Sequence, residues 1–157
     1  MSIRFIEPID LRFRIERNDR NFHIIDVRDY DFESGHIKTP TVEQFHHLNL
    51  EVFTIEKAVE LIHTYCKHLS LNCTESVDFI FHCFYSQQRG PTAAMRMVDA
   101  IEQGNIDTSI DCSKIGVKVL RGGWGLWNTR YFNDDSMIVP VESEDEESIS
   151  SSSSSDQ

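Results

Sequence analysis

Three apolar runs along the chain lack the regular alternation of a half-exposed strand, at residues 22–28, 77–81 and 115–120. Runs of this kind are typical of strands that are covered on both faces, as in parallel sheets. A shorter run at residues 3–6 predicts an opening strand. The pattern therefore predicts a central sheet of short buried strands.

Helical patterns lie between these runs. Thr54 can cap a helix whose apolar residues recur at spacings of three and four, namely Ile55, Ala58, Val59, Ile62, Cys66 and Leu69. Pro91 opens a second amphipathic helix, Pro8 suits the first turn of an earlier one, and residues 122–127 lead into a final short helix. Strands alternating with helices predict an α/β domain with a central, mainly parallel sheet flanked by helices.

Charge and composition divide the chain into two parts. The net charge is −11, but six acids and no Lys or Arg fall from Glu142 onward, so the rest carries 15 − 20 = −5. We expect one folded domain over residues 1–138 and a disordered acidic, Ser-rich tail over 139–157, which cannot bury apolar surface. A mildly acidic domain is not typical of nucleic-acid binders.

The sequence predicts neither a membrane protein nor a disulfide-rich secreted one. No apolar run approaches the roughly 20 residues of a membrane span, and the first seven residues lack the apolar core of a secretory signal. Four cysteines are too few and too irregular for a disulfide framework. We expect free thiols and a cytoplasmic or nuclear location, without membrane contact.

The most informative segment follows the second apolar run. It places Cys83 just past a strand, then five residues, then Arg89 at the start of a helix. Ligands of parallel sheets bind outside the carboxyl ends of the strands. The helix N-terminus and Arg89 both favour the thiolate, which is the nucleophilic form of cysteine.

The loop residues can surround a tetrahedral anion. Backbone N–H groups of a tight loop form an anion-binding nest, and Arg89 can bind two oxygens side-on. The predicted oxyanion loop comprises Phe84, Tyr85, Ser86, Gln87, Gln88 and Arg89, with Cys83 and Arg89 catalytic. Ser86 can hydrogen-bond the sulfur, and His82 supports the loop from beneath.

The other cysteines and the histidines have simpler interpretations. Cys66 belongs to the apolar face of its helix, and Cys112 is a small residue near a strand. Cys73 lies in a loop, and the sequence leaves open whether it forms a regulatory disulfide with Cys83. The seven histidines show no metal-ligand spacing, so we predict no metal site.

These motifs resemble a known family. The sequence His82-Cys83-x-x-Ser86-x-x-Arg89-Gly90-Pro91 is similar to the active-site signature of the M-phase-inducer dual-specificity phosphatases, which have the rhodanese fold. Asp26-Val27-Arg28 followed by Gly35-His36-Ile37 resembles the first rhodanese signature, and residues 120–124 resemble the segment that closes the domain. Small fungal members, both phosphatase-like proteins and arsenate reductases, are nearest in size.

The resemblance implies a single rhodanese-like domain, Cys83 as nucleophile and Arg89 as oxyanion-binding side chain. It implies that Asp26, Arg28 and His36 are mostly architectural. The cell-cycle phosphatases carry a glutamate directly after the cysteine, whereas this chain has Phe84 there. The identity of the general acid therefore stays open, with the acidic residues Asp29, Asp31 and Glu33 in another loop.

Three functions are consistent with this reading. The first is a protein-tyrosine or dual-specificity phosphatase acting through a thiophosphate on Cys83. The second is an arsenate reductase using glutathione and glutaredoxin, which needs no alcohol leaving group. The third is a non-catalytic phosphate-binding module or a thiosulfate sulfurtransferase, although sulfurtransferases of this fold have a shorter loop. We expect a phosphoprotein or a small phosphate or arsenate as substrate, and no cofactor apart from glutathione as co-substrate of the reductase.

Overall fold

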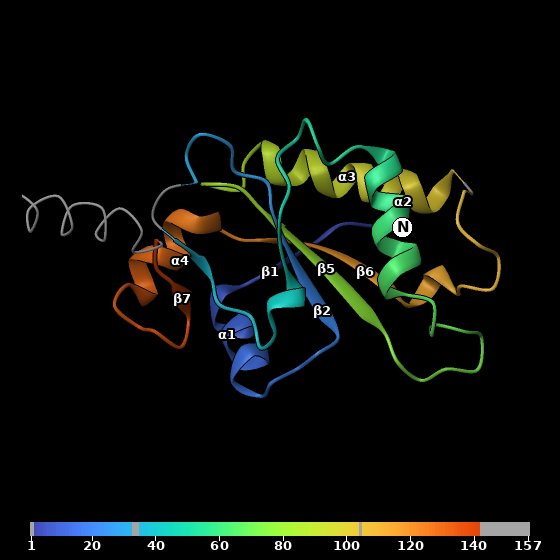
Figure 1. Ribbon diagram of the computed structural model, residues 1–157, viewed down its shortest axis with the longest axis horizontal. Coiled ribbons are helices and arrows are strands. Elements are labelled where there is room, and N and C mark those ends of the chain that lie inside the picture. The colour runs from blue at the N-terminus through green and yellow to red at the C-terminus, as the bar shows by residue number, and fades with distance from the viewer. Residues whose placement is uncertain (1, 33–34, 104, 142–157) are drawn as a thin grey trace, which may run out of the picture.

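A computed structural model describes residues 2–32, 35–103 and 105–141. Five strands form one parallel sheet in the order β1-β6-β5-β2-β4. Their bounds are Arg4–Ile6 (β1), Phe22–Asp26 (β2), Phe45–His47 (β4), Val77–His82 (β5) and Ile115–Leu120 (β6). The predicted parallel sheet is confirmed, and β5 lies at its centre (Figure 1).

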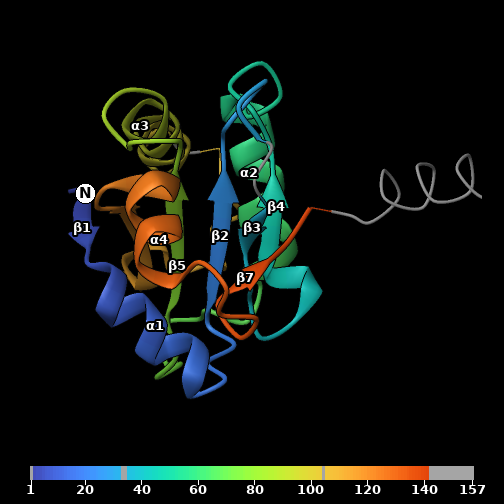
Figure 2. The same ribbon diagram turned by 90° about the vertical axis from the view of Figure 1, so that its left-hand side faces the viewer.

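Four helices cover the sheet in two layers. Their bounds are Pro8–Glu16 (α1), Ile55–Tyr65 (α2), Arg89–Glu102 (α3) and Gly123–Tyr131 (α4). Helices α2 and α3 pack together on one face, while α1 and α4 lie on the other (Figure 2). The result is a three-layer α/β/α domain, the class that the sequence predicts.

The core is divided by the sheet into two apolar clusters. Alternate residues of β5 point to opposite faces, so Phe79 and Phe81 join the cluster beneath α2 and α3, whereas Ile80 joins the one beneath α1 and α4. Both faces are thus buried, which explains the unbroken apolar runs. Trp124 and Trp127 of α4 are fully buried in the second cluster.

Short elements that the apolar pattern did not predict close the domain. Strand β3 (His36–Ile37) pairs antiparallel with β7 (Ile138–Val139), and two 3₁₀ helices span Val42–Gln44 and Cys112–Lys114. Strand β7 extends the regular structure to Val139, one residue past the predicted domain limit. Most of the predicted tail, residues 142–157, lies outside the described residues. No helix in the described ranges could cross a membrane.

Helix ends differ modestly from the expectations. Thr54 caps α2 as predicted, its hydroxyl oxygen accepting the Lys57 N–H at 3.1 Å. The helix ends at Tyr65, before the last apolar residue of its pattern. Helix α3 begins at Arg89, two residues before Pro91, so Arg89 belongs to its first turn. This start brings the guanidinium and the loop that follows β5 to the same place.

Candidate active site

Cys83 lies immediately beyond β5, at the carboxyl end of the central strand. Its side chain is buried, being 3% exposed, and it lines a cavity of about 150 Å³. The cavity is lined by Cys83, Tyr85, Gln87, Gln88 and Arg89. The structure therefore brings together the thiol, the arginine and most of the predicted loop. The cavity is small, on the scale of an oxyanion group.

The loop backbone is arranged to receive an anion. Within the part of the chain that the structure describes, no backbone N–H of residues 84–88 donates a hydrogen bond. Ser86 adopts a left-handed conformation with φ of 59°, which turns the loop back on itself. Free amides in a tight turn are the chemical basis of anion-binding nests.

The sulfur has a donor different from the one expected. The Gly90 N–H, in the first turn of α3, lies 3.2 Å from Cys83 Sγ. The Ser86 side chain is buried, but its Oγ has no hydrogen-bond partner among the described residues. The predicted bond between Ser86 and the sulfur is thus not formed. The donor to the sulfur is thus a backbone N–H at the N-terminus of α3.

Arg89 is held by an acid from another loop. Its Nη1 and Nη2 donate to Asp31 Oδ1 and Oδ2 at 3.0 and 2.5 Å. The hydrogen bonds from Arg89 lower the pKa of Asp31 to about 2, and the same pair raises the pKa of Arg89. Asp31 is therefore the member of the open acid set that reaches the site. Asp29 instead lies 3.4 Å from the side-chain amide of Asn49, and Glu33 lies outside the described residues.

Helix α4 supports the first half of the loop from behind. The backbone N–H of Trp124 donates to the Cys83 carbonyl at 3.0 Å, and that of Gly125 to the Phe84 carbonyl at 2.7 Å. Gly123 has φ of +59°, and a Cβ there would lie 2.5 Å from the Cys83 carbonyl oxygen. Gly123 and Gly125 thus allow α4 to approach the loop, a role that the sequence did not indicate.

Beneath the loop, polar residues form a buried support. His82 Nδ1 lies 3.1 Å from the Cys83 carbonyl, and its Nε2 is 3.6 Å from Asp26. Burial lowers the pKa of His82, which opposes a charged form. Asp26 and Arg28 form a fully buried ion pair at 2.6 Å. His82 was expected to support the loop, and Asp26 and Arg28 to be mostly architectural; the structure places all three in one buried group.

Arg28 also fixes the loop that carries Asp31. Its Nη2 donates to the Gly35 carbonyl at 2.8 Å. Its guanidinium lies over the rings of Phe32 and Trp124, at 4.6 and 4.5 Å from their centroids. His36, predicted as architectural, stacks at 4.0 Å on Phe45.

The other thiols lie away from Cys83. Cys73 precedes β5 and Cys83 follows it, so the six-residue strand separates them, a length of about 20 Å. Two cysteines can be bridged only when their Cα atoms are within about 7 Å. A disulfide between Cys73 and Cys83 is therefore incompatible with this fold. Burial raises the pKa of Cys66, a core residue as expected, to about 12.

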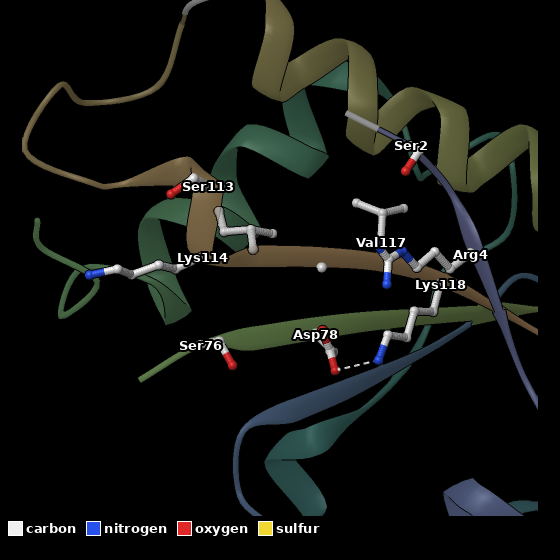
Figure 3. Close-up of a pocket in the computed structure, with 10 residues that line it drawn as sticks. Ser2, Arg4, Ser76, Asp78, Ser113, Lys114, Val117 and Lys118 are labelled. Atoms are coloured by element: carbon white, nitrogen blue, oxygen red, sulfur yellow. Dashed lines mark ion pairs between the residues drawn. The ribbon is translucent and has the colours of Figure 1, made fainter. Parts of the chain in front are cut away.

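A larger pocket, of about 350 Å³, lies at the opposite end of the strands (Figure 3). Three basic side chains line it, Arg4, Lys114 and Lys118, and the two lysines already have partners. Lys118 Nζ lies 3.0 Å from Asp78, and Lys114 Nζ donates to the carbonyls of Ser70, Leu71 and Cys73. Asp78 also binds Arg14 at 2.6 Å. The pocket contains no cysteine, and none of the residues that line it belongs to the Cys83 loop.

No cluster of three or more His, Cys, Asp or Glu residues in the described ranges could hold a metal ion.

The geometry of the Cys83 loop supports covalent chemistry on an oxyanion. Cys83 is the candidate nucleophile, the amides of residues 84–88 are candidate donors, and Arg89 is a positive charge in the lining of the same cavity. Phe84 stands where an acid was sought, its ring 4.8 Å from that of Tyr85.

Comparison with characterised proteins gives a consistent result. The chain is 28% identical to the CDC25-like phosphatase YCH1 of Saccharomyces cerevisiae, over 88% of this chain and 90% of that protein. It is 26% identical to the dual specificity phosphatase ibp1 of Schizosaccharomyces pombe, over 87% and 96%. Arsenical-resistance protein 2 of S. cerevisiae is 28% identical over 81% and 89%. The chain is thus similar over most of its length to two small phosphatases and to an arsenical-resistance protein.

The solved structures agree on the fold. Ygr203w of S. cerevisiae, described as a homologue of single-domain rhodanese and of the Cdc25 phosphatase catalytic domain, superposes with a TM-score of 0.70. The match is 28% identical and covers 89% of each chain. The As-Sb reductase of Leishmania major has the same fold, with a TM-score of 0.68 at 24% identity over 98% and 99%. No family model matches the chain. The predicted rhodanese fold is thus confirmed.

Proposed function

We propose that the protein is a cysteine-dependent phosphatase that hydrolyses phosphate monoesters through a covalent thiophosphate on Cys83. The observation that carries this proposal is the composition of the small cavity. Cys83 and Arg89 both line it, and five consecutive amides of the loop have no partner within the described ranges. Homology to CDC25-like and dual specificity phosphatases supports the same chemistry.

In the first step the thiolate attacks phosphorus, a sulfur–phosphorus bond forms and the ester oxygen leaves with its electron pair. The loop amides and Arg89 stabilise the equatorial oxygens, whose charge is held in place by groups that need no reorganisation. The Gly90 N–H, 3.2 Å from the sulfur, stabilises the thiolate before attack and after release. In the second step water attacks phosphorus, and phosphate and the free thiolate are released.

The proton for the leaving oxygen is not supplied by the loop. Residues 84–88 contain no acid, and Asp31 is ionised because Arg89 holds its pKa at about 2. We therefore expect aryl phosphates such as phosphotyrosine to be better substrates than alkyl phosphates, because a phenolate leaves with less need of a proton. A phosphorylated protein or a small aryl phosphate fits this chemistry.

The missing acid favours a second candidate, arsenate reduction. Cys83 would attack arsenic(V) and expel a hydroxyl, which leaves as water after taking a proton from solvent. Glutathione would then attack the cysteine sulfur, so that the sulfur–arsenic bond breaks and its electron pair reduces arsenic to arsenite. Glutaredoxin or a second glutathione would reduce the resulting mixed disulfide. Similarity to arsenical-resistance protein 2 supports this alternative.

One panel of assays on wild type and Cys83→Ser tests both candidates. It measures aryl phosphate hydrolysis, arsenate reduction with glutathione and glutaredoxin, and sulfur transfer from thiosulfate. We expect aryl phosphate hydrolysis in wild type and its loss in Cys83→Ser. Hydrolysis that survives in the variant would overturn the mechanism. Dominant sulfur transfer would favour a sulfurtransferase, and phosphate binding without any turnover would favour a binding module.

A further inference from the structure

Asp31 binds the edge of the Arg89 guanidinium that is formed by its two terminal nitrogens. The two terminal nitrogens each donate to a different carboxylate oxygen, at 3.0 and 2.5 Å. The pair joins the loop after β2 to the first turn of α3. Both side chains are partly buried: that of Arg89 is 31% exposed and that of Asp31 is 17% exposed. A bidentate pair of this kind fixes the plane of the guanidinium as well as its position.

The carboxylate itself is held in place. Asp31 Oδ1 also accepts the backbone N–H of Asp29 at 2.9 Å. The loop that carries it is attached to the buried core through Arg28 and the Gly35 carbonyl. Asp31 is thus a fixed acceptor, and it holds Arg89 in one orientation.

Asp31 binds Arg89 from outside the cavity. The residues that line the cavity include Cys83 and Arg89 but not Asp31. The end-on edge, Nη1 with Nη2, is occupied by the carboxylate, whereas Nε has no partner among the described residues. The side-on edge, Nε with one terminal nitrogen, is therefore the one left for two oxygens of an anion.

We propose that Asp31 is a positioning residue, which holds Arg89 end-on so that its side-on edge can bind the oxyanion on Cys83. The inference rests on the proposed function, since it assigns a role within the same site. It also separates Asp31 from general acid catalysis: a carboxylate that donates no proton but orients the arginine contributes through preorganisation.

Electrostatics and positioning predict opposite effects of removing this charge. A negative group beside Arg89 repels an incoming anion, so if charge alone mattered, Asp31→Asn would bind phosphate more tightly. If Asp31 positions Arg89, the same variant binds phosphate more weakly and loses turnover. The sign of the change therefore decides between them.

The experiment compares Asp31→Asn with Asp29→Asn, which removes the same charge from an exposed neighbour that does not contact Arg89. One measurement is the inorganic phosphate concentration that half-protects Cys83 from alkylation by iodoacetamide, which needs no turnover. The other is kcat/KM for an aryl phosphate. For Asp31→Asn we expect phosphate protection weakened about tenfold and kcat/KM lowered about 10²-fold, the scale of a misplaced catalytic group. Asp29→Asn should match wild type.

A double-mutant cycle with Arg89→Lys shows whether Asp31 acts through the arginine. In the lysine background, Asp31→Asn should change phosphate protection by less than about twofold, because there is no guanidinium left to orient. A general loss of stability would instead add to the effect of Arg89→Lys. Asp31→Glu, which keeps the charge but moves the carboxylate, should show an intermediate loss and serves if Asp31→Asn does not fold.

Phosphate protection in Asp31→Asn that equals or exceeds wild type would overturn the proposal, as would additive effects in the cycle or wild-type behaviour of Asp31→Glu. Failure of the proposed function has a different signature. Wild type would then show no aryl phosphate hydrolysis, while phosphate protection of Cys83 would still report on Asp31.

Discussion

Phe84 lies directly after Cys83, so the position that follows the proposed nucleophile has no proton donor. Its ring packs against α4, where a Cβ on Gly125 would lie 3.2 Å from it, and it contacts the cluster beneath α1 and α4. The side chain therefore contributes to packing as well as replacing an acid. Because Asp31 is ionised and paired, the described part of the site offers no protonated carboxyl group.

This residue-scale feature predicts a strong dependence on the leaving group. General acids typically contribute 10²–10⁴-fold to rates, so phenyl phosphate should be hydrolysed about 10²-fold more slowly than 4-nitrophenyl phosphate, whose phenolate is stable without a proton. The measurement is kcat/KM for a series of aryl phosphates at one pH. Nearly equal values would mean that a protonated acid acts in the reaction, and Glu33→Gln would then be the variant to examine.

At the scale of elements, the loop depends on the start of α4 as much as on α3. Gly123→Ala would place a methyl group 2.5 Å from the Cys83 carbonyl oxygen and 2.7 Å from that of Phe84, at a left-handed φ of +59°. We expect a loss of about 1–3 kcal/mol in unfolding free energy and at least about tenfold in kcat/KM, since the loop must move. Urea unfolding and aryl phosphate hydrolysis measure the two effects.

Gly125→Ala is the matched control for this prediction. Its Cβ would meet ring carbons of Phe84 and Tyr85 at 3.2 and 3.3 Å, and its φ is not in the left-handed region. The two aromatic side chains can shift more easily than the backbone carbonyl groups that a Cβ at Gly123 would meet. Alanine also has a higher helix propensity than glycine. The variant should therefore be milder than Gly123→Ala in both measurements. Equal losses would mean that the approach of α4 at Gly123 is not critical.

The comparison of elements also shows what a sequence can predict. Cys83, the loop amides and Arg89 lie within one contiguous segment, so the sequence motif was enough to predict most of the candidate active site. The Asp31–Arg89 pair joins residues 58 positions apart, and only the fold brings their loops together. The pairing of β3 with β7 has the same origin, since strands of two residues leave almost no apolar pattern. The helix N-terminus was expected to face the sulfur, but which of its N–H groups makes the contact, that of Gly90, depends on where α3 begins and on the turn of the loop.

At the scale of the whole molecule, one edge of the sheet carries a pair of neutral histidines. His23 of β2 and His46 of β4 face each other with their ring nitrogens 3.1 Å apart, and the ring of Tyr65 lies 4.1 Å from that of His23. Burial, reinforced for His23 by the neighbouring His46, lowers the pKa of both histidines to about 4. One neutral ring donates and the other accepts, an arrangement that protonation of both would break.

The pair makes the fold sensitive to acid in a defined range. An unfolded histidine titrates near its ordinary pKa of about 6.5, so below that pH the unfolded chain binds more protons than the folded one. Stability should therefore be complete above about pH 6.5 and fall as the pH drops toward 4. We expect urea unfolding at pH 5 to show roughly 1–3 kcal/mol less stability than at pH 7. In His46→Gln this loss of stability between pH 7 and pH 5 should be smaller. The control is His68→Gln, which replaces an imidazole that is 48% exposed, and it should retain the loss. An unchanged pH dependence in His46→Gln would contradict the assignment, because the excess protons would then be taken up elsewhere in the unfolded chain.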